Sequence, residues 1–210
     1  MCNYSKAFEF YEKSHQISED AVHPNHPHLA SSYGKFSGFY KTMGDYSKAL
    51  EFEVKSVKIR EETLPLNHLD LATSYNNIAV LYNNTGDYSK ALEFYEKSLK
   101  IKEKALPLNH PRLAVSYNNI AAVYSGMDDY LKALEFHEKL HEIYGKALPP
   151  NHLDFALSCA SIGQLYSNMG NDSKALALLE QALAIQQKTL PPSHPDIEET
   201  LRRINNVKKM

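Results

Sequence analysis

Apolar and polar residues alternate at helical spacing along most of the chain. In residues 71–82 the apolar positions recur at i, i+4, i+7, i+8 and i+11, which is one face of a helix. These positions are Leu71, Tyr75, Ile78, Ala79 and Tyr82. We name this predicted helix, the first of a pair, helix A.

A second helix, helix B, is predicted to begin at Tyr88. Its apolar residues repeat the helical spacing, and Glu93 with Lys97 forms an i, i+4 ion pair on the opposite face. The Gly86-Asp87 turn separates the two helices, because glycine accepts the left-handed conformation that closes a helix. Leu106-Pro107 ends helix B, since proline has no amide hydrogen to donate.

The helix pair is copied along the chain with a period of 42 residues. The phrase Tyr-Ser-Lys-Ala or a close variant begins at residues 4, 46, 88, 130 and 172, and His26, His68, His110, His152 and His194 keep the same spacing. Segments 69–110 and 111–152 are identical at 25 of 42 positions. Two independent marks in one register indicate a structural repeat.

The motifs of one copy resemble the tetratricopeptide repeat. Helix A carries Tyr75, Ile78-Ala79 and Tyr82, a glycine follows, and helix B opens with Tyr88-x-x-Ala91. The 42-residue period and the Leu-Pro-x-Asn-His-Pro loop are similar to the subclass of kinesin light chains and nephrocystin-3-like proteins. The resemblance implies an all-α fold, an α-solenoid in which antiparallel helix pairs stack into a right-handed superhelix.

The register predicts one array across residues 1–210. Four helix pairs are expected at 27–62, 69–104, 111–146 and 153–188, with an unpaired helix B at 3–20 and a capping helix at 195–208. The apolar residues of 3–20 include Phe8 and Phe10, which would normally pack against a preceding helix A. Either the chain is part of a longer protein or this end binds something.

Several residues depart from the repeat or recur within it. Asp128 replaces the turn glycine and Gly126 comes two residues early, which predicts an earlier end of the third helix A. Gly34 and Gly38 are expected to interrupt the first helix A and to make its repeat the loosest. The small residues at the helix contacts are Ala79, Ala91, Ala121, Ala133, Gly163 and Ala175, and the recurring tyrosines Tyr40, Tyr82, Tyr124 and Tyr166 are interpreted as packing residues.

The charge and composition narrow the class of protein. The chain has 23 lysines and arginines against 25 acidic residues, so the basic surface of a nucleic-acid-binding protein is not expected. Two cysteines, Cys2 and Cys159, fit a reducing compartment. No signal peptide and no apolar run of membrane-spanning length is recognised. A cytoplasmic location without membrane or nucleic-acid partners is predicted.

No catalytic or cofactor-binding motif is recognised in the sequence. The five repeated histidines form a row with one member in each copy, so loop and helix-capping roles are favoured over metal binding. Cys159 replaces a tyrosine of the earlier copies and is interpreted as a buried structural thiol. A non-enzyme without cofactor or metal is predicted; the competing hypothesis, a hydrolase or transferase, requires Cys159 to meet a histidine.

The predicted binding surface is the helix A face opposite the packed tyrosines. It is neutral and rich in amides, which pair with both groups of a peptide unit. Its residues are Thr73, Asn76, Asn77, Val80, Asn83 and Asn84, then Val115, Asn118, Asn119, Ala122 and Ser125, then Leu157, Ala160, Gln164, Ser167 and Asn168. The resemblance implies that Asn76 and Asn118 hold a peptide backbone. Lys35, Lys41, Arg202 and Arg203 are predicted to contact acidic residues of a partner.

These observations favour a protein interaction scaffold that binds an extended peptide segment of a partner. The asparagines are alternatively solvated residues that were copied with the repeat. A second function hypothesis is an accessory region of a larger protein, either a cargo adaptor similar to kinesin light chains or a regulatory repeat region attached to an enzyme. A further expected contact surface is the N-terminal helix at 3–20.

Overall fold

The computed structural model describes residue 13, residues 26–149 and residues 151–209 of the chain. These residues form helices connected by short loops, without strands, and they divide into two compact units. Unit 1 comprises residues 1–105 and unit 2 residues 106–210. The predicted helix at 3–20 lies outside the described residues, apart from residue 13.

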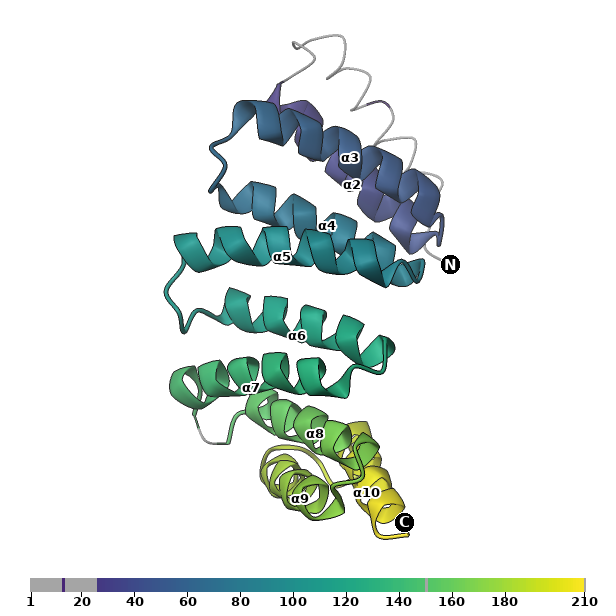
Figure 1. The fold of residues 1–210 in the computed structure, drawn as a ribbon, viewed down its shortest axis with the longest axis vertical. Helices are drawn as coiled ribbons and strands as arrows, with labels where there is room; N and C mark the ends of the chain where they lie inside the picture. Colours follow the sequence, from purple (N-terminus) through teal and green to yellow (C-terminus); the bar gives the residue numbers. More distant parts are fainter. Residues whose placement is uncertain (1–12, 14–25, 150, 210) are drawn as a thin grey trace. The chain divides into compact units, whose positions relative to one another are not determined.

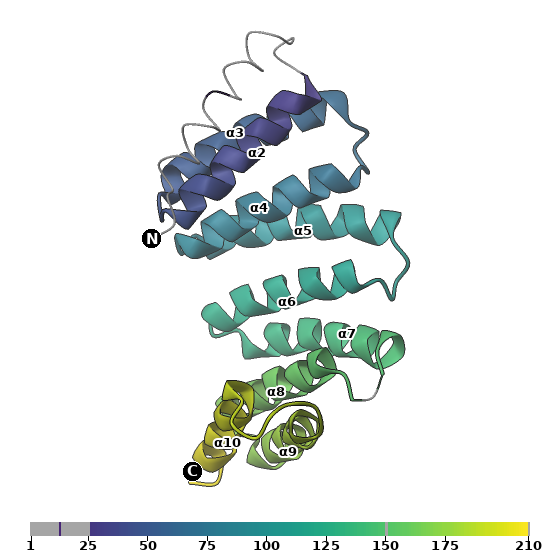
Figure 2. The same cartoon turned by 180° about the vertical axis from the view of Figure 1, so that it is seen from behind.

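Unit 1 contains two antiparallel helix pairs. The first pair is α2 (Pro27–Thr42) with α3 (Tyr46–Thr63), and the second is α4 (Leu69–Asn84) with α5 (Tyr88–Ala105). Figures 1 and 2 show from opposite sides that the two helices of each pair lie side by side.

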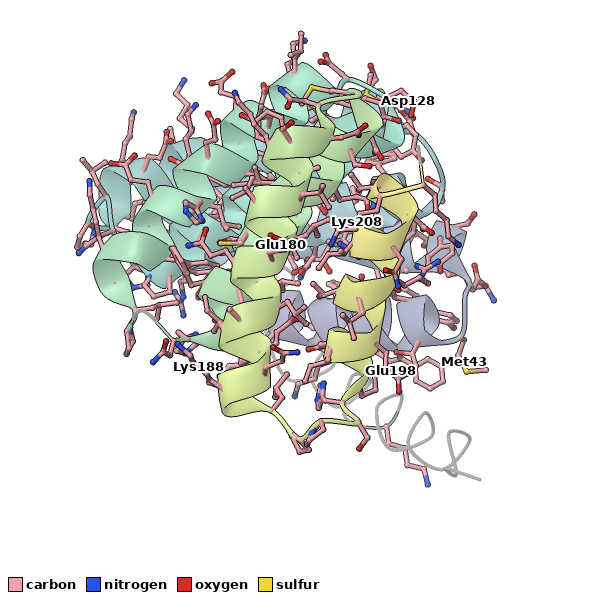
Figure 3. All side chains as sticks on the ribbon, turned by 90° about the horizontal axis from the view of Figure 1, so that it is seen from below. Met43, Asp128, Glu180, Lys188, Glu198 and Lys208 are labelled. Atoms are coloured by element: carbon pink, nitrogen blue, oxygen red, sulfur yellow. The ribbon has the colours of Figure 1, made fainter. Side chains whose placement is uncertain are left out.

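Unit 2 contains two further pairs and a final helix. The pairs are α6 (Pro111–Gly126) with α7 (Tyr130–Ala147), and α8 (Leu153–Asn168) with α9 (Asp172–Thr189). The last helix, α10 (Pro195–Val207), packs against α9. Its buried face carries Ile197, Ile204 and Val207. Figure 3 shows Lys208 beside Glu180 of α9, and these side chains form an ion pair at 3.5 Å.

Histidine caps every described helix A and α10. The Nδ1 atom of each histidine accepts a hydrogen bond from the backbone N–H two residues further on, at 3.1–3.2 Å. The capping residues are His26, His68, His110, His152 and His194. The predicted capping role of these histidines is confirmed, and it explains their spacing because each copy needs one N-terminal cap.

The turn between helices A and B uses a left-handed residue in each copy. Gly44, Gly86 and Gly170 have φ values of 74–79°, and Asp128 takes the same place with φ of 59°. The prediction of an earlier end for the third helix A was therefore wrong: α6 has 16 residues, like α4. Aspartate tolerates this conformation better than most residues, and Asp128 also accepts a hydrogen bond from the Tyr130 hydroxyl at 2.7 Å.

The first helix A is continuous over both of its internal glycines. α2 runs without interruption from Pro27 to Thr42, which contradicts the expected break at Gly34 and Gly38. Glycine lowers helix propensity by about 1 kcal/mol per residue, and burial of Leu29, Ala30 and Phe36 compensates for this in the folded chain.

Small residues allow the two helices of a pair to approach closely. Ala79, Ala91, Ala121, Ala133 and Ala175 are completely buried, as predicted. At Gly163 an added Cβ would lie 3.0 Å from Leu179 Cγ and 3.2 Å from the Ala175 carbonyl oxygen, so α8 and α9 approach closely at this glycine.

The recurring tyrosines pack at the edge of each pair. Tyr82 stacks on Phe94 with ring centroids 5.9 Å apart, and Lys90 lies over the tyrosine ring. Tyr40 and Tyr124 make the same contacts with Phe52 and Phe136. All of these tyrosines are half-buried, which confirms a packing role.

None of the helices in the described part of the chain is both long and apolar enough to cross a membrane.

Candidate functional site

The exposed face of α6 and α8 in unit 2 contains part of the predicted binding surface. On α6, Val115, Asn118 and Ala122 are exposed, and on α8, Leu157 is exposed. Val115 is 52% and Leu157 is 61% exposed. Two large apolar side chains therefore face solvent beside an asparagine, which is the composition expected of a protein-binding surface.

A pocket of about 120 Å³ opens at this surface. Helices α6, α7 and α8 all contribute lining residues. The lining residues are Val115, Asn118, His137, Leu140, Tyr144, Asp154, Leu157, Ser158 and Ser161. The volume is well below the roughly 300–1,000 Å³ of small-molecule sites and corresponds in scale to a single side chain.

His137 is the least usual residue of the pocket. Its side chain is 7% exposed, and its Nδ1 atom is buried without a hydrogen-bond partner. Burial lowers the pKa of His137 below 6.5, so the imidazole is neutral at pH 7. An unpaired buried polar atom costs about 1–3 kcal/mol of folding free energy, so His137 destabilises unit 2 unless its Nδ1 gains a hydrogen bond.

Asp154 lies at the first turn of α8 and contributes a carboxylate to the pocket. Its side chain is 53% exposed, and Oδ2 is 3.7 Å from Nδ1 of the capping His152. The pKa of Tyr144 is raised by its burial and then by the negative charge of Asp154, which places the phenol and the carboxylate close together.

The corresponding surface of unit 1 is built differently. Asn77, on helix α4, donates a hydrogen bond through Nδ2 to Glu53 Oε1 at 3.2 Å. Glu53 belongs to α3, is 1% exposed, and also receives hydrogen bonds from Ser37 and Ser74. Arg60 donates to Ser74 and adds a positive charge near the carboxylate. Asn77 thus stabilises the interior of unit 1.

A small pocket of about 60 Å³ lies over Glu53. Its lining residues are Gly34, Ser37, Gly38, Lys41, Glu53, Asn77 and Leu81. The two glycines leave helix α2 without side chains where later copies carry Asn76 and Val80, or Asn118 and Ala122. Burial raises the pKa of Glu53 despite four favourable interactions, so this pocket is polar and its carboxylate already has donors.

The remaining predicted groove residues are distributed between the two units. In unit 1, Thr73 and Asn84 are exposed, and Asn76, Val80 and Asn83 are half-buried. In unit 2, Asn119, Ser125 and Ser167 are half-buried, and Gln164 donates through Nε2 to Asn168 Oδ1 at 2.9 Å. Ala160 is 4% exposed, so its predicted place on the surface was wrong: its face of α8 turns into the core of unit 2.

The lysine and arginine side chains that were predicted to contact acidic partner residues differ in their surroundings. Lys35 and Lys41 are exposed on α2, and Lys41 lines the small pocket of unit 1. In unit 2, Arg202 and Arg203 both form ion pairs with Glu199, at 2.7 Å and 2.9 Å. A partner carboxylate would have to compete with Glu199 for these two guanidinium groups.

The structure adds residues to the candidate site that the sequence analysis did not select. His137 and Tyr144 come from helix B, whereas the predicted surface was restricted to helix A. A signal was present, because the inward position of helix B changes from Glu53 to Tyr95, His137 and Leu179 while its neighbours repeat. A position whose polarity changes from copy to copy indicates that the copies differ in their surroundings there.

Cys159 is fully buried in unit 2, and burial raises its pKa to about 11. The thiol is therefore protonated at neutral pH, as predicted for a structural residue. Within residues 13, 26–149 and 151–209, no three histidine, cysteine or acidic side chains are arranged to hold a metal ion.

Comparison with known proteins defines the class. The model of the tetratricopeptide repeat family matches residues 1–62, 55–104, 70–146 and 112–188. The chain belongs to the tetratricopeptide repeat family, and its fold is an all-α solenoid of this type. A search of curated proteins gave no match.

Solved structures indicate similarity to the kinesin-light-chain type of repeat. A kinesin light chain candidate from Podosopora anserina with nearly identical TPR-like repeats is 27% identical, with a TM-score of 0.77 over 88% of this chain and 87% of that chain. BtubC (BKLC) from P. vanneervenii is 22% identical, with a TM-score of 0.77 over 98% and 80% of the two chains. The apo form of RapI is 19% identical, with a TM-score of 0.76 over 90% and 66%. The last two similarities, at their low identity, concern the fold alone.

Proposed function

We propose that this protein is a non-catalytic interaction module that binds an extended peptide segment of a partner protein on its helix A faces. The observation that carries the proposal is the surface of α6 and α8, where Val115 and Leu157 are more than half exposed beside Asn118. The asparagine offers a donor and an acceptor to a peptide unit, and the two apolar side chains offer contact area.

The charge balance and the state of the buried Cys159 thiol also support this proposal. Lysines and arginines nearly equal acidic residues, which favours a protein partner over nucleic acid. Cys159 is protonated and inaccessible, so it does not serve as a nucleophile at neutral pH. We place the module in the cytoplasm, without a cofactor.

Selection of peptides from a random twelve-residue phage library on the immobilised chain tests this proposal. Enriched peptides are expected to bind at least about tenfold more weakly to Asn118→Asp, since the new carboxylate repels peptide carbonyl oxygens. Asn76→Asp, tested separately, reports whether unit 1 contributes to binding.

Asn205→Asp is the control variant, because Asn205 is also an exposed helical asparagine of unit 2 and lies on α10. Its affinity should equal that of the wild type. Circular dichroism establishes that each variant is folded. Enrichment of no peptide, or equal binding to all three variants, would contradict the proposed function.

A further inference from the structure

We infer that the pocket between α6, α7 and α8 receives a lysine or arginine side chain of the bound peptide. This inference rests on the proposed function and specifies the residue class that the partner segment must carry at one position. Three properties of the pocket lead to it: its apolar walls, its single negative charge, and a buried polar atom without a partner.

The walls of the pocket fit an aliphatic stem. Val115 and Leu157 line the pocket and are more than half exposed, whereas Leu140, which also lines it, is 3% exposed. Lysine and arginine bury three or four methylene groups along apolar surface while the charged end remains near polar groups. The volume of about 120 Å³ suits one such side chain.

The charge of the pocket selects a cation. Asp154 contributes the one carboxylate among the lining residues, and burial disfavours the charged form of His137, the one lining residue that could carry a positive charge. More than half of the Asp154 side chain is exposed. An ammonium or guanidinium group can therefore reach the carboxylate, whereas an acidic side chain would be repelled.

The buried histidine supplies the independent observation. Position 137 corresponds to Tyr95 in the preceding copy and to Leu179 in the following one, which are 4% and 0% exposed. His137 places a polar ring at this position, and this ring is shorter than that of Tyr95. The Nδ1 atom of His137 lacks a hydrogen-bond partner, and the residue lines the pocket. Because Nδ1 is itself inaccessible, a bound side chain with several N–H donors supplies the missing hydrogen bond only with a rotation of the ring, whereas a purely aliphatic side chain cannot supply it at all.

The peptides selected on the wild-type chain test the inference. They are expected to share a lysine or arginine at one position, and replacement of that residue by norleucine should weaken binding about tenfold, since norleucine keeps the stem and removes the charge. Asp154→Asn should cause a similar loss. On Asp154→Asn the norleucine replacement should have little further effect, because both changes remove the same interaction.

Two variants sharpen this test. Asp196→Asn is the matched control, since Asp196 occupies the same position of α10 and its Oδ2 is also 3.7 Å from the capping histidine, His194, and it should bind like the wild type. Asp154→Arg introduces the residue that stands at the equivalent position 112 of the preceding copy. A fresh selection on this variant should enrich aspartate or glutamate in place of the basic residue.

The two proposals fail in different ways. Peptides that require Asn118 but show no shared basic residue, or that bind equally with norleucine, would overturn the inference and leave the proposed function standing. A basic residue whose contribution persists in Asp154→Asn would also overturn it. Absence of any peptide that depends on Asn118 would refute both.

Discussion

Glu53 in unit 1 and His137 in unit 2 occupy the same position of helix B, but their hydrogen bonding differs. In unit 1, Glu53 is buried with hydrogen bonds from Ser37, Ser74 and Asn77 and with Arg60 nearby. In unit 2, His137 is buried with one nitrogen unpaired beside an open pocket. Copies of one repeat thus differ in whether the polar group at this position has its hydrogen bonds supplied by the chain.

The contacts between paired helices also differ between the two units, being polar in unit 1 and apolar in unit 2 at one equivalent position. In unit 1, Ser56 and Ser98 donate hydrogen bonds of 2.7 Å to the carbonyl oxygens of Ala30 and Ala72 on the facing helix A. In unit 2 the equivalent positions are Leu140 and Ala182, which contribute apolar packing. The paired helices of unit 1 are thus joined by buried polar contacts at this position, whereas those of unit 2 are joined by apolar packing.

Removal of the Glu53 carboxylate should have the largest effect. Glu53→Ala leaves the donors of Ser37, Ser74 and Asn77 and the charge of Arg60 without their acceptor, and should lower the free energy of unfolding by about 3 kcal/mol. Urea unfolding followed by circular dichroism measures this. Glu51→Ala removes an exposed glutamate that is paired with Lys55 one turn later on the same helix, and it should change the free energy of unfolding by at most about 0.5 kcal/mol. Similar losses for both variants would mean that the polar network contributes nothing.

Replacement of His137 by leucine, the residue of the next copy, should raise the free energy of unfolding, whereas Glu53→Ala should lower it. His137→Leu removes the unpaired nitrogen and adds apolar contact, so the free energy of unfolding should rise by about 1 kcal/mol. The reciprocal change, Leu179→His, introduces an imidazole at a fully buried site and should lower it. Differential scanning calorimetry of both variants checks this prediction, which a lower melting temperature for His137→Leu would contradict.

The two units should respond to pH with opposite signs. Burial lowers the pKa values of His137 and His141, so folded unit 2 binds fewer protons than the unfolded chain below about pH 6.5, and its stability decreases as pH falls through the lowered pKa values. Burial raises the pKa of Glu53, so the stability of unit 1 decreases as pH rises from about 4.5 through that raised pKa.

These pH-dependent changes in the stability of the two units are the smallest of the expected effects. Hydrogen exchange measured by mass spectrometry follows each unit separately. Between pH 7 and 5, protection factors of α7 amides, corrected for intrinsic exchange rates, should fall relative to those of α3. His137→Leu should reduce the change in α7 and leave α3 as it was. A parallel change in both helices would show that burial of these groups does not determine the pH response.

The repeat architecture was predictable from the sequence because its signals are local and copied. Helical spacing, turn residues and caps act within a few residues, and the 42-residue period multiplies each signal. The histidine caps of α4 and α6 illustrate this. The error at Asp128 arose because an aspartate can adopt the left-handed conformation that the sequence analysis reserved for glycine.

The candidate site was predictable only in part. Asn118 and Val115 were selected from their face of helix A, and both are exposed as expected. Asn77 and Ala160 were selected by the same reasoning, yet one donates to the buried Glu53 and the other is itself buried. Periodicity assigns a residue to a face, but the neighbouring helix decides whether that face is covered.

The sequence by itself therefore determined the class of fold, the register of the helices and the capping role of the histidines, since these depend on short-range backbone geometry. Tertiary structure alone decided that Glu53 and His137, equivalent in the repeat, have different surroundings. It also brought Asp154, Leu157 and His137 to one pocket, because their proximity depends on how α7 and α8 pack across 42-residue copies. Hydrogen-bond satisfaction and pocket shape are properties of several helices together, and no pattern along one helix contains them.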